Sequence, residues 1–307
     1  MNNIKFKYDI IIADGKNDGI TETLIQKINC DKDLLINFYK YDTNAGYKNY
    51  YEMRYDALSK VKTKYVMLCD NDDFVLPDGI DELINFLEKN KDYVSASGPI
   101  LNIEIDNMKN VTYGRHVNYM GAYKYHRMEE PLAKWNDQIK SVFNKFQPNF
   151  FNVFKTEIYL KLAEETKKLN FSDLTIDEFY IQLSAVTYGK NKIISSIIHY
   201  IRQRGTSSIS RNFIFSEDLI KCNMPSDVRL MADQISSKIS NDKKIKKDYQ
   251  DLILKNFAEY LNYYLAHTII RYRFKRLFKI KQKLISLDNY FIYLKVHPKL
   301  FNTHILN

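Results

Sequence analysis

An acidic run at the end of a short apolar segment constrains this 307-residue chain more than any other feature. Residues Tyr65–Cys69 (YVMLC) have the continuous apolar character of a strand that is buried on both faces. They lead directly into Asp70–Asp73 (DNDD), and a helical pattern starts at Pro77. Ligands of open α/β folds bind at the carboxyl ends of parallel strands. The order strand, carboxylates, helix therefore predicts a binding site.

Strand and helix patterns alternate over the first 110 residues, which predicts an α/β fold with a mostly parallel sheet flanked by helices. We expect Asp78 to cap the helix that begins near Pro77. The other predicted strands are Tyr8–Ala13, Leu34–Tyr41 and Tyr93–Ala96, and the other predicted helices are Thr21–Ile28 and Tyr50–Lys60.

The second part of the chain is predicted to be mostly helical. The pattern indicates helices at Leu132–Phe146, Thr156–Leu169 and Ile176–Tyr188, a strand at Lys192–Arg202, and further helices over residues 216–285 with a break near Ser240–Lys247. Gly205 and several serines suggest a linker at residues 205–216. We therefore expect one α/β domain over residues 1–205 and a helical, basic region over residues 206–307.

Composition excludes several classes of protein. With 45% hydrophobic and 27% charged residues, the chain is neither disordered, nor collagen-like, nor a polytopic membrane protein. The three cysteines are far apart and the six histidines show no metal-binding pairs, so neither disulfides nor a cysteine or histidine metal site is expected. The first residues carry no apolar leader, and no apolar segment reaches the roughly 20 residues of a spanning helix. These features predict a cytoplasmic protein.

The acidic run favours a site for a divalent cation. Carboxylates are the preferred ligands of hard cations such as Mg²⁺ and Mn²⁺. A cation bound there could bridge a nucleotide diphosphate and neutralise a leaving phosphate. The alternative is a solvated acidic turn that merely precedes a helix.

Three segments together resemble the family 2 glycosyltransferases of the GT-A fold. Lys62–Tyr93 resembles the strand of that family that ends in a D-x-D motif and is followed by a proline and a helix. Asp9–Gly19 (DIIIADGKNDG) is similar to its V-V-D-D-G-S-x-D-G loop, with Ala13 in place of the first aspartate, and Thr43–Gly46 (TNAG) to its N-x-G turn. The resemblance covers residues 8–98, and it implies a nucleotide-sugar half over 1–98 and an acceptor half over 99–205.

This resemblance implies roles for individual residues. Asp14 would contact the nucleotide base, and Asn44 and Gly46 belong to the same nucleotide-sugar site. Asp70 would lie at the ribose, the diphosphate and the metal. Asp72 would be the direct ligand of Mn²⁺ or Mg²⁺, and Asp73 is a weaker candidate.

Thr175–Lys190 resembles the segment of the family in which an acidic residue opens the acceptor-side helix and acts as general base. Counted back from Gly189, Glu178 falls on the base position and Asp177 on the residue before it. The alternative for Glu178 is a capping box with Thr175, since the two are three residues apart at a helix start. Downstream, Arg202 and Arg204 are candidates for the diphosphate, and the alternative is a solvated strand end.

One part of the family pattern is missing. The family begins with a strand that carries a P-T-Y-N-R-like loop and precedes the strand matching Tyr8–Ala13, and this sequence starts too late to contain it. An empty central position would leave backbone groups unsatisfied. We therefore expect the strands Tyr8–Ala13 and Tyr65–Cys69 either to flank a gap or to close up within one sheet.

Charge is unevenly distributed along the chain. Residues 1–110 hold 14 basic and 19 acidic side chains, whereas residues 241–307 hold 14 basic and 5 acidic ones. Arg271–Lys283 has seven basic residues among 13, interspersed with apolar ones. A basic amphipathic helix favours contact with an anionic membrane surface. A plain solvated face is the main alternative, and no nucleic-acid partner is expected.

Taken together, these patterns predict a metal-dependent, inverting glycosyltransferase. The expected donor is a nucleotide-sugar of the UDP-sugar type, and the expected acceptor is a glycan or a lipid-linked glycan in cell-surface polysaccharide synthesis. The protein would work in the cytoplasm, peripheral to the inner face of the membrane. One alternative is a non-catalytic relative that binds an anionic surface or a partner. Another is a nucleotidyltransferase-like enzyme, although the sequence carries no glycine-rich phosphate loop near its start.

Overall fold

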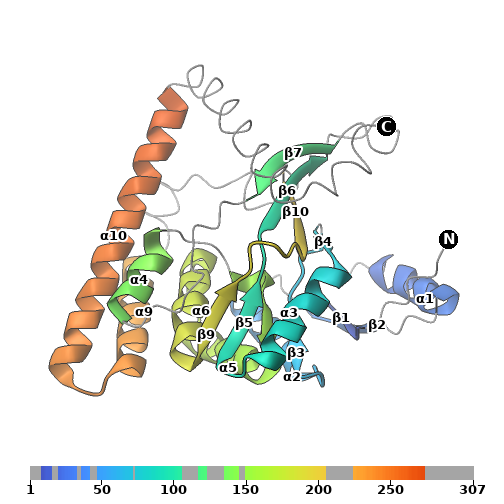
Figure 1. Cartoon of the computed structure of the whole chain (residues 1–307), viewed down its shortest axis with the longest axis horizontal. Coiled ribbons are helices and arrows are strands. Elements are labelled where there is room, and N and C mark those ends of the chain that lie inside the picture. The colour runs from blue at the N-terminus through green and yellow to red at the C-terminus, as the bar shows by residue number, and fades with distance from the viewer. Residues whose placement is uncertain are drawn as a thin grey trace.

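The computed structural model describes residues 8–15, 20–32, 36–41, 47–71, 73–105, 117–122, 135–144, 149–204 and 224–273. Within these ranges the chain is an α/β structure, with the C-terminal helices on the left of Figure 1 and the strands, interspersed with further helices, to their right. The predicted fold class, an α/β structure with sheets flanked by helices, is confirmed. The sheets are not mostly parallel as predicted, because four of the seven strand pairs among the described residues are antiparallel.

Two parallel strands begin the described chain. β1 (Ile10–Asp14) pairs with β2 (Ile36–Lys40), and α1 (Ile20–Lys32) connects them. After β2 the chain forms α2 (Tyr47–Ser59), which packs on β1 and on α5. This βαβ arrangement agrees with the predicted alternation of strand and helix.

Two four-stranded sheets follow. The first has the order β3-β8-β5-β9, and the second has the order β4-β10-β6-β7. Both are mixed: β5 with β9 and β10 with β6 are parallel, and the other pairs are antiparallel. Their strands are β3 (Tyr65–Val66), β4 (Phe74–Val75), β5 (Tyr93–Ser97), β6 (Ile100–Ile105), β7 (Val117–Ala122), β8 (Val153–Lys155), β9 (Lys190–Ile193) and β10 (Tyr200–Arg204).

Two predictions about strands are wrong. The segments Tyr8–Ala13 and Tyr65–Cys69 do not share a sheet, because β1 pairs with β2 while β3 pairs with the antiparallel β8. The predicted strand Lys192–Arg202 is divided into β9 and β10, which lie in different sheets. A turn separates them, closed by a hydrogen bond from the Ile197 N–H to the Ile194 carbonyl at 3.1 Å. The exposed polar residues Ser195 and Ser196 occupy that turn.

The helix after the acidic run is α3 (Pro77–Lys89), and its cap differs from the prediction. Leu76 is the N-cap residue and Pro77 is the first helical residue, so Asp78 lies in the first turn instead of capping it. Proline suits this position because its fixed φ is helical and it has no N–H to leave unsatisfied.

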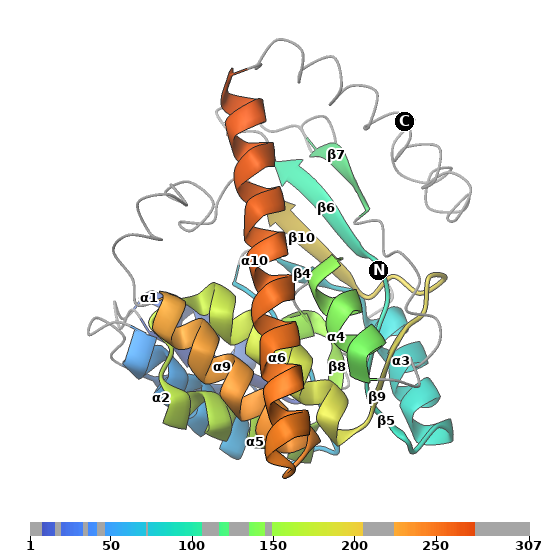
Figure 2. The same cartoon turned by 90° about the vertical axis from the view of Figure 1, so that its left-hand side faces the viewer.

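The described helices of the second half are α4 (Trp135–Asn144), α5 (Thr156–Leu169), α6 (Leu174–Tyr188), α9 (Met224–Ile239) and α10 (Lys243–Arg273), and a 3₁₀ turn, η1 (Asn149–Phe151), precedes β8. The buried side chains of α5 pack with Leu58 and Phe154, whereas α4, α6, α9 and α10 share a separate hydrophobic core. Phe143, Phe179 and Phe257 bring α4, α6 and α10 together within this core. Figure 2 shows α9 and α10 against the face of the molecule that α4 and α6 form. No helix among the described residues is long and apolar enough to cross a membrane.

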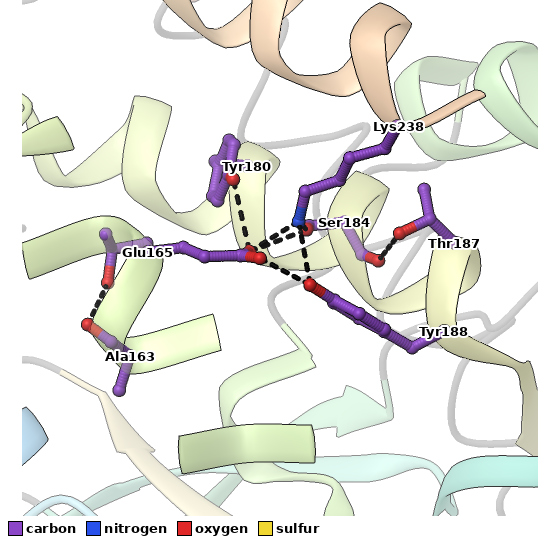
Figure 3. Close-up of polar contacts among 8 residues, drawn as sticks. Ala163, Glu165, Tyr180, Ser184, Thr187, Tyr188 and Lys238 are labelled. Atoms are coloured by element: carbon purple, nitrogen blue, oxygen red, sulfur yellow. Dashed lines mark hydrogen bonds and ion pairs between the residues drawn. The ribbon is translucent and has the colours of Figure 1, made fainter. Parts of the chain in front are cut away.

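A polar cluster joins α5, α6 and α9 beside this core (Figure 3). The carboxylate of Glu165 accepts hydrogen bonds from Tyr180 at 3.1 Å, from Ser184 at 3.1 Å and from Tyr188. Lys238 of α9 forms an ion pair with Glu165 and lies 4.7 Å from the ring centroid of Tyr188. Each of these polar groups therefore has a partner on a neighbouring helix.

Candidate functional site

The acidic run forms a tight turn between β3 and β4. A hydrogen bond from the Asp73 N–H to the Asp70 carbonyl, at 3.2 Å, closes it. Asp70 is exposed and Asp73 is partly buried. Asp72, the predicted direct metal ligand, lies outside the described residues. We call residues 70–73 the acidic loop.

Tyr200 of β10 contacts both ends of the acidic loop. Its hydroxyl accepts a hydrogen bond from the Asp70 N–H at 3.1 Å and donates one to the Asp73 carboxylate at 2.7 Å. The side chain is fully buried, and its ring stacks on Phe151 with 4.3 Å between the centroids. The loop is thus hydrogen-bonded to a residue that lies 127 positions beyond it.

The helix that carries the predicted base begins with an aspartate cap. Asp173 is the N-cap residue of α6, and its side chain accepts a hydrogen bond from the Thr175 N–H at 2.6 Å. The capping box considered for Thr175 and Glu178 therefore does not cap this helix, because the helix starts at Leu174, earlier than the apolar pattern indicates.

Asp177 faces the protein interior and is paired with Arg54. The two Nη atoms of Arg54 donate to the two carboxylate oxygens of Asp177 at 2.7 and 2.8 Å, and one of them also donates to the Thr166 hydroxyl at 2.6 Å. Both charged side chains are buried. Burial alone would lower the pKa of Arg54, but the charge of Asp177 holds it above its ordinary value.

Glu178, the next residue, is partly exposed. Burial raises the pKa of its carboxyl to about 8, the negative charge of Asp177 adds to the rise, and the positive charge of Arg202 opposes it. Asp70 also acts on the Glu178 carboxyl electrostatically. Asp70 and Arg202, which come from two distant segments, therefore both lie within electrostatic reach of Glu178.

Arg202 stands two residues after Tyr200 on β10, so the two side chains lie on the same side of the strand. Its guanidinium lies 5.8 Å from the centroid of the Phe151 ring, on which Tyr200 also stacks. The backbone of Arg204 pairs with Glu104, while its side chain lies outside the described part of the chain.

The other predicted nucleotide-site residues are Asp14, Asn44 and Gly46. Asp14 ends β1 in the separate two-stranded sheet, and its backbone carbonyl accepts a hydrogen bond from the Tyr41 N–H at 2.8 Å. Asn44 and Gly46 lie outside the described residues. Among the residues that are described, no group of three or more His, Cys, Asp or Glu side chains could hold a metal ion.

Sequence reasoning missed Arg54 and Tyr200. Arg54 had a signal: with Tyr51 and Leu58 it follows a helical i, i+3, i+7 spacing, and all three are buried. A cation on an apolar helix face needs a buried anion. Tyr200 had no such signal, because the chain has 24 tyrosines and nothing local distinguishes this one.

The fold is similar to that of solved structures of S. aureus TarS. The crystal structure of S. aureus TarS residues 1–349 matches with a TM-score of 0.51 and 11% identity, covering 94% of this chain and 73% of that one. The same protein in complex with UDP matches with a TM-score of 0.51 and 13% identity, over 94% and 73%. Its complex with UDP-GlcNAc matches with a TM-score of 0.51 and 14% identity, over 93% and 73%. At these identities the likeness shows a GT-A type fold.

Comparison of sequences places the chain in a family. No curated protein sequence matches it significantly. The model of the family described as "Glycosyl transferase family 2" matches residues 2–156. That match covers just over half of the chain and includes the acidic loop, so this protein belongs to the family 2 glycosyltransferases.

Proposed function

We propose that this glycosyltransferase is a metal-dependent, inverting enzyme that moves a sugar from a UDP-sugar to a glycan or lipid-linked acceptor, in cell-surface polysaccharide synthesis. The two TarS complexes, one with UDP and one with UDP-GlcNAc, support a uridine nucleotide as the donor. The chemistry of the acceptor follows from the family resemblance and from the basic C-terminal segment.

The main observation behind this proposal is that the carboxylates of Asp177 and Glu178 have different surroundings. Both oxygens of Asp177 are engaged by Arg54, whereas Glu178 is partly exposed and its pKa of about 8 lies close to neutral pH. A general base works best with a pKa near the working pH. Glu178 would take the proton from the acceptor hydroxyl as that oxygen bonds to the anomeric carbon. The bond from that carbon to the diphosphate breaks, UDP leaves with the electron pair, and the configuration inverts.

Asp70 and Asp72 are the residues that would hold Mn²⁺ or Mg²⁺. The exposed carboxylate of Asp70 at the start of the acidic loop has the oxygen chemistry that such ions prefer. Further ligands would come from the diphosphate of the donor, since hard cations in such sites bind protein carboxylates and substrate phosphates together. When bound, the ion would neutralise charge on the departing diphosphate. Arg202 could pair with a phosphate oxygen in the same way.

A panel of UDP-sugars, scored by UDP release with and without Mn²⁺, tests the proposal. We expect Glu178→Gln to abolish transfer with an unchanged melting temperature.

Asp177→Asn should instead lower stability, by about 3–5 kcal/mol, because it leaves the buried Arg54 charge unpaired. Glu157→Gln, at an exposed position of α5, is the matched control and should behave like wild type. Full activity of Glu178→Gln would refute the assignment of the base, and a wild-type protein that releases no UDP from any sugar would refute the proposed donor.

Membrane contact through Arg271–Lys283 is a separate part of the proposal. Only the backbone of Arg271–Arg273, at the end of α10, is described, and the rest of the segment lies outside the described residues. We expect sedimentation with phosphatidylglycerol vesicles that weakens as salt is raised, and none with phosphatidylcholine vesicles. Equal binding to both kinds of vesicle would contradict it.

A further inference from the structure

The acidic loop carries several negative charges close together, and their repulsion opposes its closed conformation. Three aspartates stand within four residues, and like charges at this spacing repel one another. Such a loop tends to open unless hydrogen-bond donors hold it. The turn bond from the Asp73 N–H to the Asp70 carbonyl is one contact that closes it.

The Tyr200 hydroxyl connects the same two residues. It accepts from the Asp70 N–H at 3.1 Å and donates to the Asp73 carboxylate at 2.7 Å. A tyrosine hydroxyl has one proton to donate and lone pairs to accept, so both bonds can exist together. The bond to the carboxylate is charge-assisted and therefore the stronger of the two. One side chain thus spans the first and last residues of the loop.

Tyr200 itself is held on a rigid support. β10 lies between β4 and β6, and Tyr200 is in register with Val75 on one side and Ile100 on the other. Its ring is fully buried and stacks on Phe151. β4 directly follows the acidic loop, so the exit of the loop is paired with the strand that carries Tyr200.

The two residues before Tyr200, Ile198 and His199, are also fixed by close contacts with neighbouring segments. The carbonyl of His199 accepts a hydrogen bond from the Leu76 N–H at 2.9 Å, and the buried imidazole of His199 contacts the Phe151 carbonyl at 2.8 Å. Gly79 of α3 approaches the Ile198 carbonyl so closely that a Cβ there would come within 2.1 Å of it. The hydroxyl of Tyr200 is therefore presented to the loop from a fixed position.

We propose that Tyr200 is a positioning residue of the donor site, whose hydroxyl holds the acidic loop in the conformation that receives the metal-bound diphosphate of the nucleotide-sugar. This inference rests on the proposed function. Binding to a loop that is already ordered avoids the cost of ordering it. The bound donor keeps the same loop contacts through the reaction, so Tyr200 should act on donor binding and leave the chemical step unchanged.

The test uses Tyr200→Phe, which removes the hydroxyl and keeps the ring. Tyr180→Phe is the matched control, because Tyr180 is also buried and also donates its hydroxyl to a carboxylate, that of Glu165, at 3.1 Å. Each full-length variant is compared with wild type in three measurements: hydrogen exchange of the Asp70 amide without ligand, calorimetric binding of UDP with Mn²⁺, and the kcat and KM for the UDP-sugar.

We expect the Asp70 amide to exchange faster in Tyr200→Phe than in wild type. The variant should bind UDP with Mn²⁺ about tenfold more weakly, which corresponds to one lost hydrogen bond of about 1.4 kcal/mol. Its KM for the donor should rise by a similar factor, with kcat unchanged. Tyr180→Phe should match wild type in all three. Wild-type exchange at Asp70 in Tyr200→Phe would overturn the inference, and so would equal effects in the two variants, since these indicate a general loss of stability.

The exchange measurement needs no ligand, so it separates the two proposals. If wild type binds no UDP with Mn²⁺, the proposed function fails. The role of Tyr200 in the donor site then fails with it, even if faster exchange shows that the hydroxyl orders the loop. If wild type binds UDP and Tyr200→Phe binds it equally well, only the inference about Tyr200 fails.

Discussion

At the scale of single residues, two adjacent acids at the start of α6 have opposite surroundings. Successive residues of a helix point about 100° apart, so only one of the pair can enter the core. Asp177 is the one that does, and the buried guanidinium of Arg54 makes its burial tolerable. The same ion pair joins α2 to α6 and leaves Glu178 on the side of Asp70 and Arg202.

The pH dependence of transfer should follow the ionisation of Glu178. Its pKa is raised to about 8, so only half of the molecules carry the carboxylate that can accept a proton at that pH, and fewer do below it. We expect kcat/KM, which reports the free enzyme, to rise about tenfold per pH unit below that value and to level off above it. Initial rates between pH 5 and 9.5 measure this. A profile already flat from pH 5.5 to 8 would mean that the base has an ordinary carboxyl pKa and is another residue.

At the scale of elements, α5, α6 and α9 meet around Glu165 (Figure 3). The side chains of Glu165 and Lys238 are each only 20% exposed. Burial alone would raise the pKa of Glu165. Hydrogen bonds from Lys238, Tyr188 and Ser184, together with the positive charge of Lys238, hold that pKa below its ordinary value. A carboxyl of this kind stabilises the fold above its unfolded pKa, and the contribution is lost as pH falls through the folded one.

Replacing Glu165 should therefore weaken the acid dependence of stability. Between pH 7 and 3, we expect the free energy of unfolding of wild type to fall more than that of Glu165→Gln, which has no proton to gain at this position. Urea unfolding at a series of pH values gives both curves. Glu164→Gln, beside it on the exposed ion pair with Lys168, is the control and should track wild type. Parallel curves for wild type and Glu165→Gln would show that the cluster does not couple to pH.

At the scale of the whole molecule, the C-terminal helices share their core with the helix that carries Glu178. Phe257 of α10 contacts Phe143 of α4 and Phe179 of α6 edge to face, with centroids 6.0 and 5.4 Å apart. Phe179 directly follows Glu178 in α6. The division into a domain over 1–205 and a region over 206–307 stays a prediction. Phe257 of the second part packs on Phe179 of the first, next to Glu178.

Phe257→Ala should therefore affect both parts of the molecule together. The side chain is 3% exposed, and such truncations cost about 3–5 kcal/mol. We expect a lower melting temperature in a single transition, with sugar transfer lost over the same temperature range. Glu259→Ala, at an exposed position two residues along α10, should change neither. Two separate transitions, with transfer following the higher one, would show that α10 does not support the site.

The sequence by itself determined the alternation of the main strands and helices over the first 100 residues, the bounds of α5, the position of the acidic loop after a strand and ahead of a helix, and the family. Each of these depends on local periodicity and on motifs within a few dozen residues. Only the tertiary structure decided that β3 pairs with β8, that β9 and β10 are separate strands, and that Asp177 meets Arg54 while Tyr200 meets the acidic loop. These contacts join residues up to 130 positions apart. Periodicity shows that a side chain is buried, but its partner depends on how distant elements approach each other in space.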